Sequence, residues 1–177
     1  MTTLPRGEAA SEHSAVRRRR AVAAAGAVSA GLLVLTACDK PTPVATITVG
    51  SSSVNDEAIC YNDGDKLNTK SLGKCAKNTE DVKSITVGQD ETVRFGVDPE
   101  IADSGWVILV NGRPFIDTTK QTYTEIPSNA FFNAQYGTQG DTNTVSIQEG
   151  AKGVKGLWTF KLKQSESWKD AMKESLS

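Results

Sequence analysis

The chain has 177 residues, enough for one domain, a formal net charge of -1 and a single histidine, His13. This charge argues against a nucleic-acid-binding protein, because such affinity depends largely on neutralising phosphates with Lys and Arg. The three cysteines leave one unpaired after any disulfide has formed, so one of them needs a different role.

The N-terminal segment is typical of an export signal. Four consecutive arginines at 17–20 precede an uncharged apolar run at 21–35. This run is shorter than the ~20 residues that a membrane-spanning helix needs, and a polar stretch at 39–43 follows it. A cleaved signal is therefore favoured over a membrane span.

The apolar run ends in Leu35, Thr36, Ala37 and Cys38, which resemble the lipobox of bacterial lipoproteins. The resemblance implies that the Cys38 thiol is acylated, that the signal peptide 1–37 is removed, and that 38–44 is a tether. The protein would then be lipid-anchored and extracytoplasmic, on the outer face of the cytoplasmic membrane. The alternative is an ordinary secretory peptide cut after Ala37, which leaves Cys38 as a free thiol.

The remaining cysteines, Cys60 and Cys75, flank a polar, lysine-rich loop. Outside the membrane disulfides persist, so we expect these two to pair. Closing a loop of about 15 residues stabilises the fold by roughly 3 kcal/mol in the entropic description. The alternative, a metal site, lacks the close spacing and further ligands that zinc requires, and we predict neither metal nor cofactor.

Short runs with strand character then follow one another, separated by Gly, Asn, Asp and Ser. Asn111-Gly112 predicts a tight hairpin turn, and Pro114 places the returning strand near an edge. In the last run Trp158, Phe160 and Leu162 are expected to face one way, with Thr159, Lys161 and Lys163 on a solvated side. The predicted strands are 45–49, 58–61, 82–87, 92–97, 106–110, 113–116, 121–126, 144–148 and 157–163.

Many short strands without a long helical period indicate an antiparallel β-sandwich at 45–164, with an immunoglobulin-like arrangement as the first choice. Both domain cysteines precede Trp106, so the Cys, Trp, Cys order of antibody domains is absent. Only 165–177 indicates a short C-terminal helix.

Five stretches of the sequence together look like an uncharacterised actinobacterial lipoprotein family, a domain of unknown function. The resemblance covers nearly the whole chain after Cys38 and implies a surface lipoprotein of a high-GC Gram-positive bacterium. It brings no catalytic residue with it. The stretches are 38–43, 60–64, 94–106, 131–137 and 158–163.

Composition excludes several kinds of chemistry. Cleavage before Cys38 would remove His13, so Ser-His-Asp and Cys-His catalysis and a blue-copper site are all excluded from the domain. The acidic segment 98–103 is interpreted as a loop between strands, a place where ligand contacts often gather. Its carboxylates are also the groups that a glycosidase uses as acid and base.

We therefore expect a non-catalytic binding module for an unknown protein or cell-wall ligand. Phe132 and Tyr136 form an aromatic shelf in this hypothesis, or else belong to the core. One alternative is a protease inhibitor, because 86–97 and the Pro-containing loop before Trp106 are similar to a chagasin-like sandwich, although the Asn-Pro-Thr-Thr-Gly loop is absent. The other is a carboxylate-dependent hydrolase. The predicted patch contains Asp98, Glu100, Asp103, Phe132 and Tyr136.

Overall fold

The structure, a computed structural model, describes residues 42–77, 81–133 and 140–175. Two units are distinguished along the chain, Met1–Pro41 and Thr42–Ser177, and the sandwich belongs to the second. The predicted signal peptide, Cys38 and most of the tether lie outside the described residues, as does Tyr136. Across the described ranges, no helix is long and apolar enough to cross a membrane.

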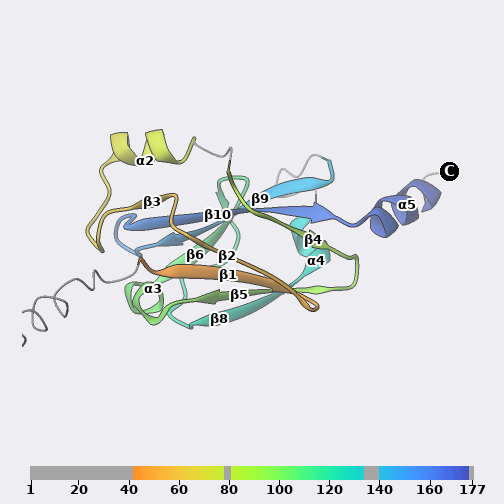
Figure 1. Cartoon of the computed structure of the whole chain (residues 1–177), viewed down its shortest axis with the longest axis horizontal. Coiled ribbons are helices and arrows are strands. Elements are labelled where there is room, and N and C mark those ends of the chain that lie inside the picture. The colour runs from red at the N-terminus through yellow and green to blue at the C-terminus, as the bar shows by residue number, and fades with distance from the viewer. Residues whose placement is uncertain (1–41, 78–80, 134–139, 176–177) are drawn as a thin grey trace, which may run out of the picture. The chain divides into compact units, whose positions relative to one another are not determined.

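The domain is a sandwich of two β-sheets (Figure 1), as predicted. One sheet has the strand order β2-β1-β5-β8, with β1 at Val44–Val49, β2 at Ser52–Glu57, β5 at Thr92–Val97 and β8 at Tyr123–Pro127. The other has the order β3-β10-β9-β6-β7, and β4 also pairs with β10. Its strands are β3 Cys60–Tyr61, β4 Ser84–Val87, β6 Trp106–Val110, β7 Arg113–Pro114, β9 Thr142–Glu149 and β10 Gly156–Gln164.

The core lies between the sheets because apolar residues alternate along the strands that face each other. In β1 and β5 every second residue is buried, and in β6 the same holds from Trp106 to Val110. Phe95 and Phe131 contact each other across this core, with ring centroids 5.8 Å apart. The alternation that predicted these strands is thus the feature that buries their side chains.

Asn111 and Gly112 form the predicted hairpin turn, and both have the positive φ angles, 49° and 78°, that such a turn requires. The turn joins β6 to β7, which is the edge strand that Pro114 predicted. One expected exposure is wrong: Thr159 is buried, and its hydroxyl shares a hydrogen bond of 2.9 Å with that of Ser146 on β9. Pairing of the two hydroxyls lets both lie out of water at little cost.

Four elements differ from the sequence-based prediction. β2 was not predicted, and β4 is parallel to β10 in an otherwise antiparallel sheet. The acidic segment is not a loop but helix α3, Pro99–Ser104. Proline suits the first turn of a helix because its missing N–H would have no partner there, and burial of Ile101 and Ala102 holds the turn against the core. The predicted disulfide loop contains helix α2, Thr69–Cys75.

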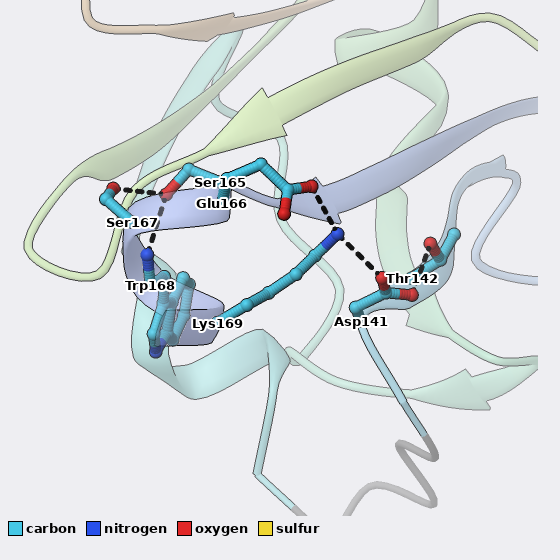
Figure 2. Close-up of polar contacts among 7 residues, drawn as sticks. All are labelled: Asp141, Thr142, Ser165, Glu166, Ser167, Trp168 and Lys169. Carbon is cyan, nitrogen blue, oxygen red and sulfur yellow. Dashed lines mark hydrogen bonds and ion pairs between the residues drawn. The ribbon is translucent and has the colours of Figure 1, made fainter. Parts of the chain in front are cut away.

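The C-terminal helix α5, Glu166–Ser175, and the single turn α4, Ser128–Phe131, lie at the other end of the sandwich from α3 (Figure 1). Figure 2 shows how α5 is attached: Lys169 lies between Asp141 and Glu166, 2.8 Å from a carboxylate oxygen of each. The Trp168 ring is buried and meets Phe132 edge to face, with centroids 4.8 Å apart.

Candidate ligand-binding site

The site begins with a carboxylate in an apolar position. Val145, Ile147 and Glu149 alternate along β9, so all three side chains point into the sandwich. Glu149 is 0% exposed, and neither of its carboxylate oxygens has a hydrogen-bond partner among the described residues. Buried polar groups are nearly always hydrogen-bonded, so an unpartnered acid in this place calls for an explanation.

Strand pairing surrounds Glu149 with residues from three other strands. Glu149 is directly opposite Trp106 on β6 and Gly156 on β10, and Gly156 is opposite Tyr61 on β3. Cross-strand partners share a face of the sheet, so these residues form one inward-facing row. The row lies at the end of the sandwich where α3 packs against β9.

Four polar side chains come close to Glu149, and together with it they are called the Glu149 cluster. Glu100 and Ser104 come from α3, Tyr61 from β3, and Lys155 from the turn between β9 and β10. The Tyr61 hydroxyl donates to Glu100 Oε1 at 3.4 Å, and Lys155 Nζ donates to Ser104 Oγ at 3.2 Å. All four are partly exposed, so they lie between buried Glu149 and solvent.

Burial raises the pKa of the Glu149 carboxyl above its ordinary value, because the charged form loses its hydration. The Ser104 hydroxyl, which lies near the carboxyl without meeting hydrogen-bond geometry, and the Lys155 charge partly offset this rise, while the Glu100 charge adds to it. The pKa of Tyr61 is raised to about 12, first by burial and then by the charges of Glu100 and Glu149. The cluster is therefore rich in oxygen atoms that can accept hydrogen bonds.

The Trp158 ring forms a rigid wall of the cluster. Gly156 makes room for it: a Cβ atom at this position would lie 2.5 Å from the Trp158 ring and 3.1 Å from Glu149 Oε2. The indole Nε1 donates to the Pro43 carbonyl at 2.9 Å, and the Tyr61 ring lies against the indole with centroids 6.1 Å apart. The cluster consequently lies near Pro43, at the start of the domain.

The structure separates the residues of the predicted patch. Asp98 accepts a hydrogen bond of 2.8 Å from the Val44 amide and so holds the start of β1, while Asp103 is exposed on α3. Phe132 follows α4, near the Thr92 end of β5, whereas Glu100 lies beyond the opposite end of that strand. Phe132 therefore does not join the acidic residues in one surface, and its contact with Trp168 leaves it only partly exposed.

The expected pairing of Cys60 with Cys75 is confirmed, with Cα atoms 5.6 Å apart. The Leu67 amide within the disulfide loop donates to the Val154 carbonyl at 2.7 Å, which fastens the loop to the β9–β10 turn. The disulfide thereby helps to hold Tyr61 in its place in the Glu149 cluster.

Of the Glu149 cluster, the sequence-based patch contained only Glu100. A signal for Glu149 did exist, because a glutamate that continues the alternation of Val145 and Ile147 breaks the apolar pattern at an inward position. Ser104 and Lys155 gave no such signal, since serine and lysine are ordinary in turns.

A cavity of about 410 Å³ lies elsewhere, between residues 56–59 and 81–83. Its lysine, Lys83, is engaged with the Asp56 carboxylate at 3.2 Å and with the Asn55 carbonyl at 2.6 Å. Because its cation is already satisfied, this cavity is a weaker candidate than the Glu149 cluster. In the ranges that the structure describes, no three His, Cys, Asp or Glu residues lie close enough to hold a metal ion.

Comparison with known proteins adds no family to this description. No family model matches the sequence, and no curated protein matches it. The resemblance to an actinobacterial lipoprotein family stays a prediction.

Proposed function

We propose that this chain is an exported lipoprotein, anchored through Cys38 to the outer face of the cytoplasmic membrane, whose sandwich is a non-catalytic binding module. The observation that carries the binding function is the fully buried, unpartnered carboxyl of Glu149 at the end of the sandwich. Such a group costs stability, and departures of this kind from ordinary folding rules concentrate at functional sites.

The framework around the Glu149 cluster also favours binding. The strands of one sheet, the disulfide and helix α3 hold the backbone that carries the cluster, so a ligand would meet groups that are largely in place. The ligand would be a protein or cell-wall component that presents hydrogen-bond donors, because carboxylate and hydroxyl oxygens dominate the cluster.

The anchor and the site are tested separately. Cys38→Ala should release the protein from the membrane and abolish incorporation of labelled fatty acid, and persistent labelling would contradict the lipobox assignment. For the site, crosslinking on intact cells should capture a partner with the unmodified chain and lose it with Glu149→Gln. Glu57→Gln, an exposed glutamate on β2, is the matched control. Equal capture by Glu149→Gln would show that the cluster is not the binding surface.

A carboxylate hydrolase is the second candidate, and the raised pKa of Glu149 beside the charge of Glu100 favours it. A carboxyl with a raised pKa is what a general acid needs. The double variant Glu100→Gln, Glu149→Gln should then lose all turnover of chromogenic glycosides. Absence of turnover by the unmodified chain across such a panel would exclude this candidate in favour of binding.

A further inference from the structure

The unpartnered carboxyl of Glu149 points to a specific ligand chemistry. We propose that the Glu149 cluster binds a primary ammonium group of its ligand, between the carboxyls of Glu149 and Glu100 and the Tyr61 hydroxyl. The proposal rests on the proposed binding function and names the class of ligand. Three arguments support it: the acceptors, the aromatic wall and the lysine that already approaches the same place.

The acceptors match the donors of an ammonium group. A primary ammonium carries three N–H donors and no acceptor, whereas the cluster offers two carboxyls and a phenol oxygen. The Glu100 charge raises the pKa of both Glu149 and Tyr61, so both groups lie close enough to Glu100 for its charge to oppose their ionisation. A cation among them would relieve that opposition and supply the partner that Glu149 lacks.

Aromatic rings pack beside the residues of the same cluster. Trp158 is held over Gly156 by packing and by its bond to the Pro43 carbonyl, and Tyr61 leans against it. Rings attract cations through their faces, and this attraction strengthens when the cation is shielded from water. Carboxyls with fixed aromatic rings favour an organic cation, and the described residues do not gather enough ligands for a metal ion.

Lys155 shows that an ammonium group fits near Glu149. Its Nζ lies 3.2 Å from Ser104 Oγ, and its charge lowers the pKa of Glu149, yet it hydrogen-bonds neither oxygen of that carboxyl. Lys155 is partly exposed, at the end of a turn that contains Gly150 and Gly153, and lysine stems are flexible. The ligand's ammonium would displace Lys155 and approach Glu149 directly.

The test uses the full chain with its disulfide formed and with Cys38→Ala, so that it is not lipidated. Titration with n-butylammonium chloride, followed by ¹H–¹⁵N spectra, should give saturable shifts at Gly156 and at the Trp158 indole. Tetramethylammonium, which has no N–H donor, should bind more weakly. Glu149→Gln should weaken n-butylammonium binding roughly tenfold or more, as expected for loss of a charge-assisted hydrogen bond. Asp103→Asn, an exposed acid on α3, is the matched control and should change nothing.

Lys155→Met separates ligand binding from a purely structural role of the cluster. Because the variant removes the competing ammonium, n-butylammonium should bind more tightly to it than to the unmodified chain. Absence of saturable shifts in both proteins, or equal affinity in Glu149→Gln, would overturn the proposal. If that happened while cellular crosslinking still depended on Glu149, the ligand class alone would be wrong. If neither n-butylammonium binding nor cellular crosslinking depended on Glu149, the cluster would not be a binding site.

Discussion

Replacing Glu149 with glutamine should make the domain more stable at neutral pH. Glutamine keeps the shape of the side chain and cannot ionise, so the variant isolates the cost of the charge. Glu149 is fully buried, and burial is the main cause of its raised pKa. The other titratable groups that face it are Glu100, Tyr61 and Lys155, of which Lys155 alone lowers that pKa.

The sign of the pH dependence follows from proton binding. Between the unfolded pKa, about 4.3, and the higher folded pKa, the folded chain binds more protons at Glu149 than the unfolded chain does. This contribution to stability is fully present below the unfolded pKa and is lost as the pH rises through the folded pKa. Each pKa unit of difference corresponds to about 1.4 kcal/mol. The size of the pKa rise therefore sets the expected gain for Glu149→Gln, because the glutamine amide is as unpaired as the carboxyl and differs from it only in that it cannot ionise.

Urea unfolding of the two proteins at several values between about pH 4 and pH 8 measures this difference directly. The free energies of unfolding should be nearly equal at the acid end, and the gap should widen in favour of Glu149→Gln as the pH rises. Glu57→Gln serves as the control, because Glu57 is exposed. A gap that does not change with pH, or a variant that is less stable at neutral pH, would refute the reasoning and show that Glu149 is ionised and paired.

Three further variants test the packing around the site and at the far end. Trp158→Phe removes the donor to the Pro43 carbonyl and part of a fully buried ring, so it should lower the free energy of unfolding by more than the ~1 kcal/mol of the bond alone, measured by urea titration. Unchanged stability would show that neither this bond nor the packing of the larger ring contributes. Cys60→Ala with Cys75→Ala should cost about 3 kcal/mol, seen as a lower Tm that matches the reduced parent protein. Trp168→Ala should cost about 3–5 kcal/mol, because its ring is 5% exposed and packs on Phe132. A loss below about 1 kcal/mol would mean that α5 is not part of the cooperative fold.

Strands that alternate between apolar and polar residues could be predicted because one face of each is buried. β2 escaped prediction for the opposite reason: it is an edge strand, five of its six residues are polar, and only Val54 packs on the core. Its pairing with β1 depends on backbone hydrogen bonds, which any side chains allow, so the residue types of β2 do not reveal the pairing.

The site depended on information that local patterns do not contain. Glu100 was recognised as acidic, but its position beside Glu149 follows from α3 folding onto β9, about 50 residues later in the chain. Tyr61 joins them through a register shared by β3, β10 and β9. Such long-range pairing is specified by the whole sandwich, so the sequence alone could not show that Phe132 and Glu100 lie at different ends of β5.

The position of β1 determines how the domain would respond to a pulling force applied through the residues that precede it. β1 lies between β2 and β5 and is hydrogen-bonded to both. The residues at its start are held by two further bonds, from the Trp158 indole to the Pro43 carbonyl and from the Val44 amide to the Asp98 carboxylate. Tension along β1 would load both ladders in shear, so many hydrogen bonds would have to break together. The domain could therefore remain folded under a mechanical load that would open a strand peeled from an edge.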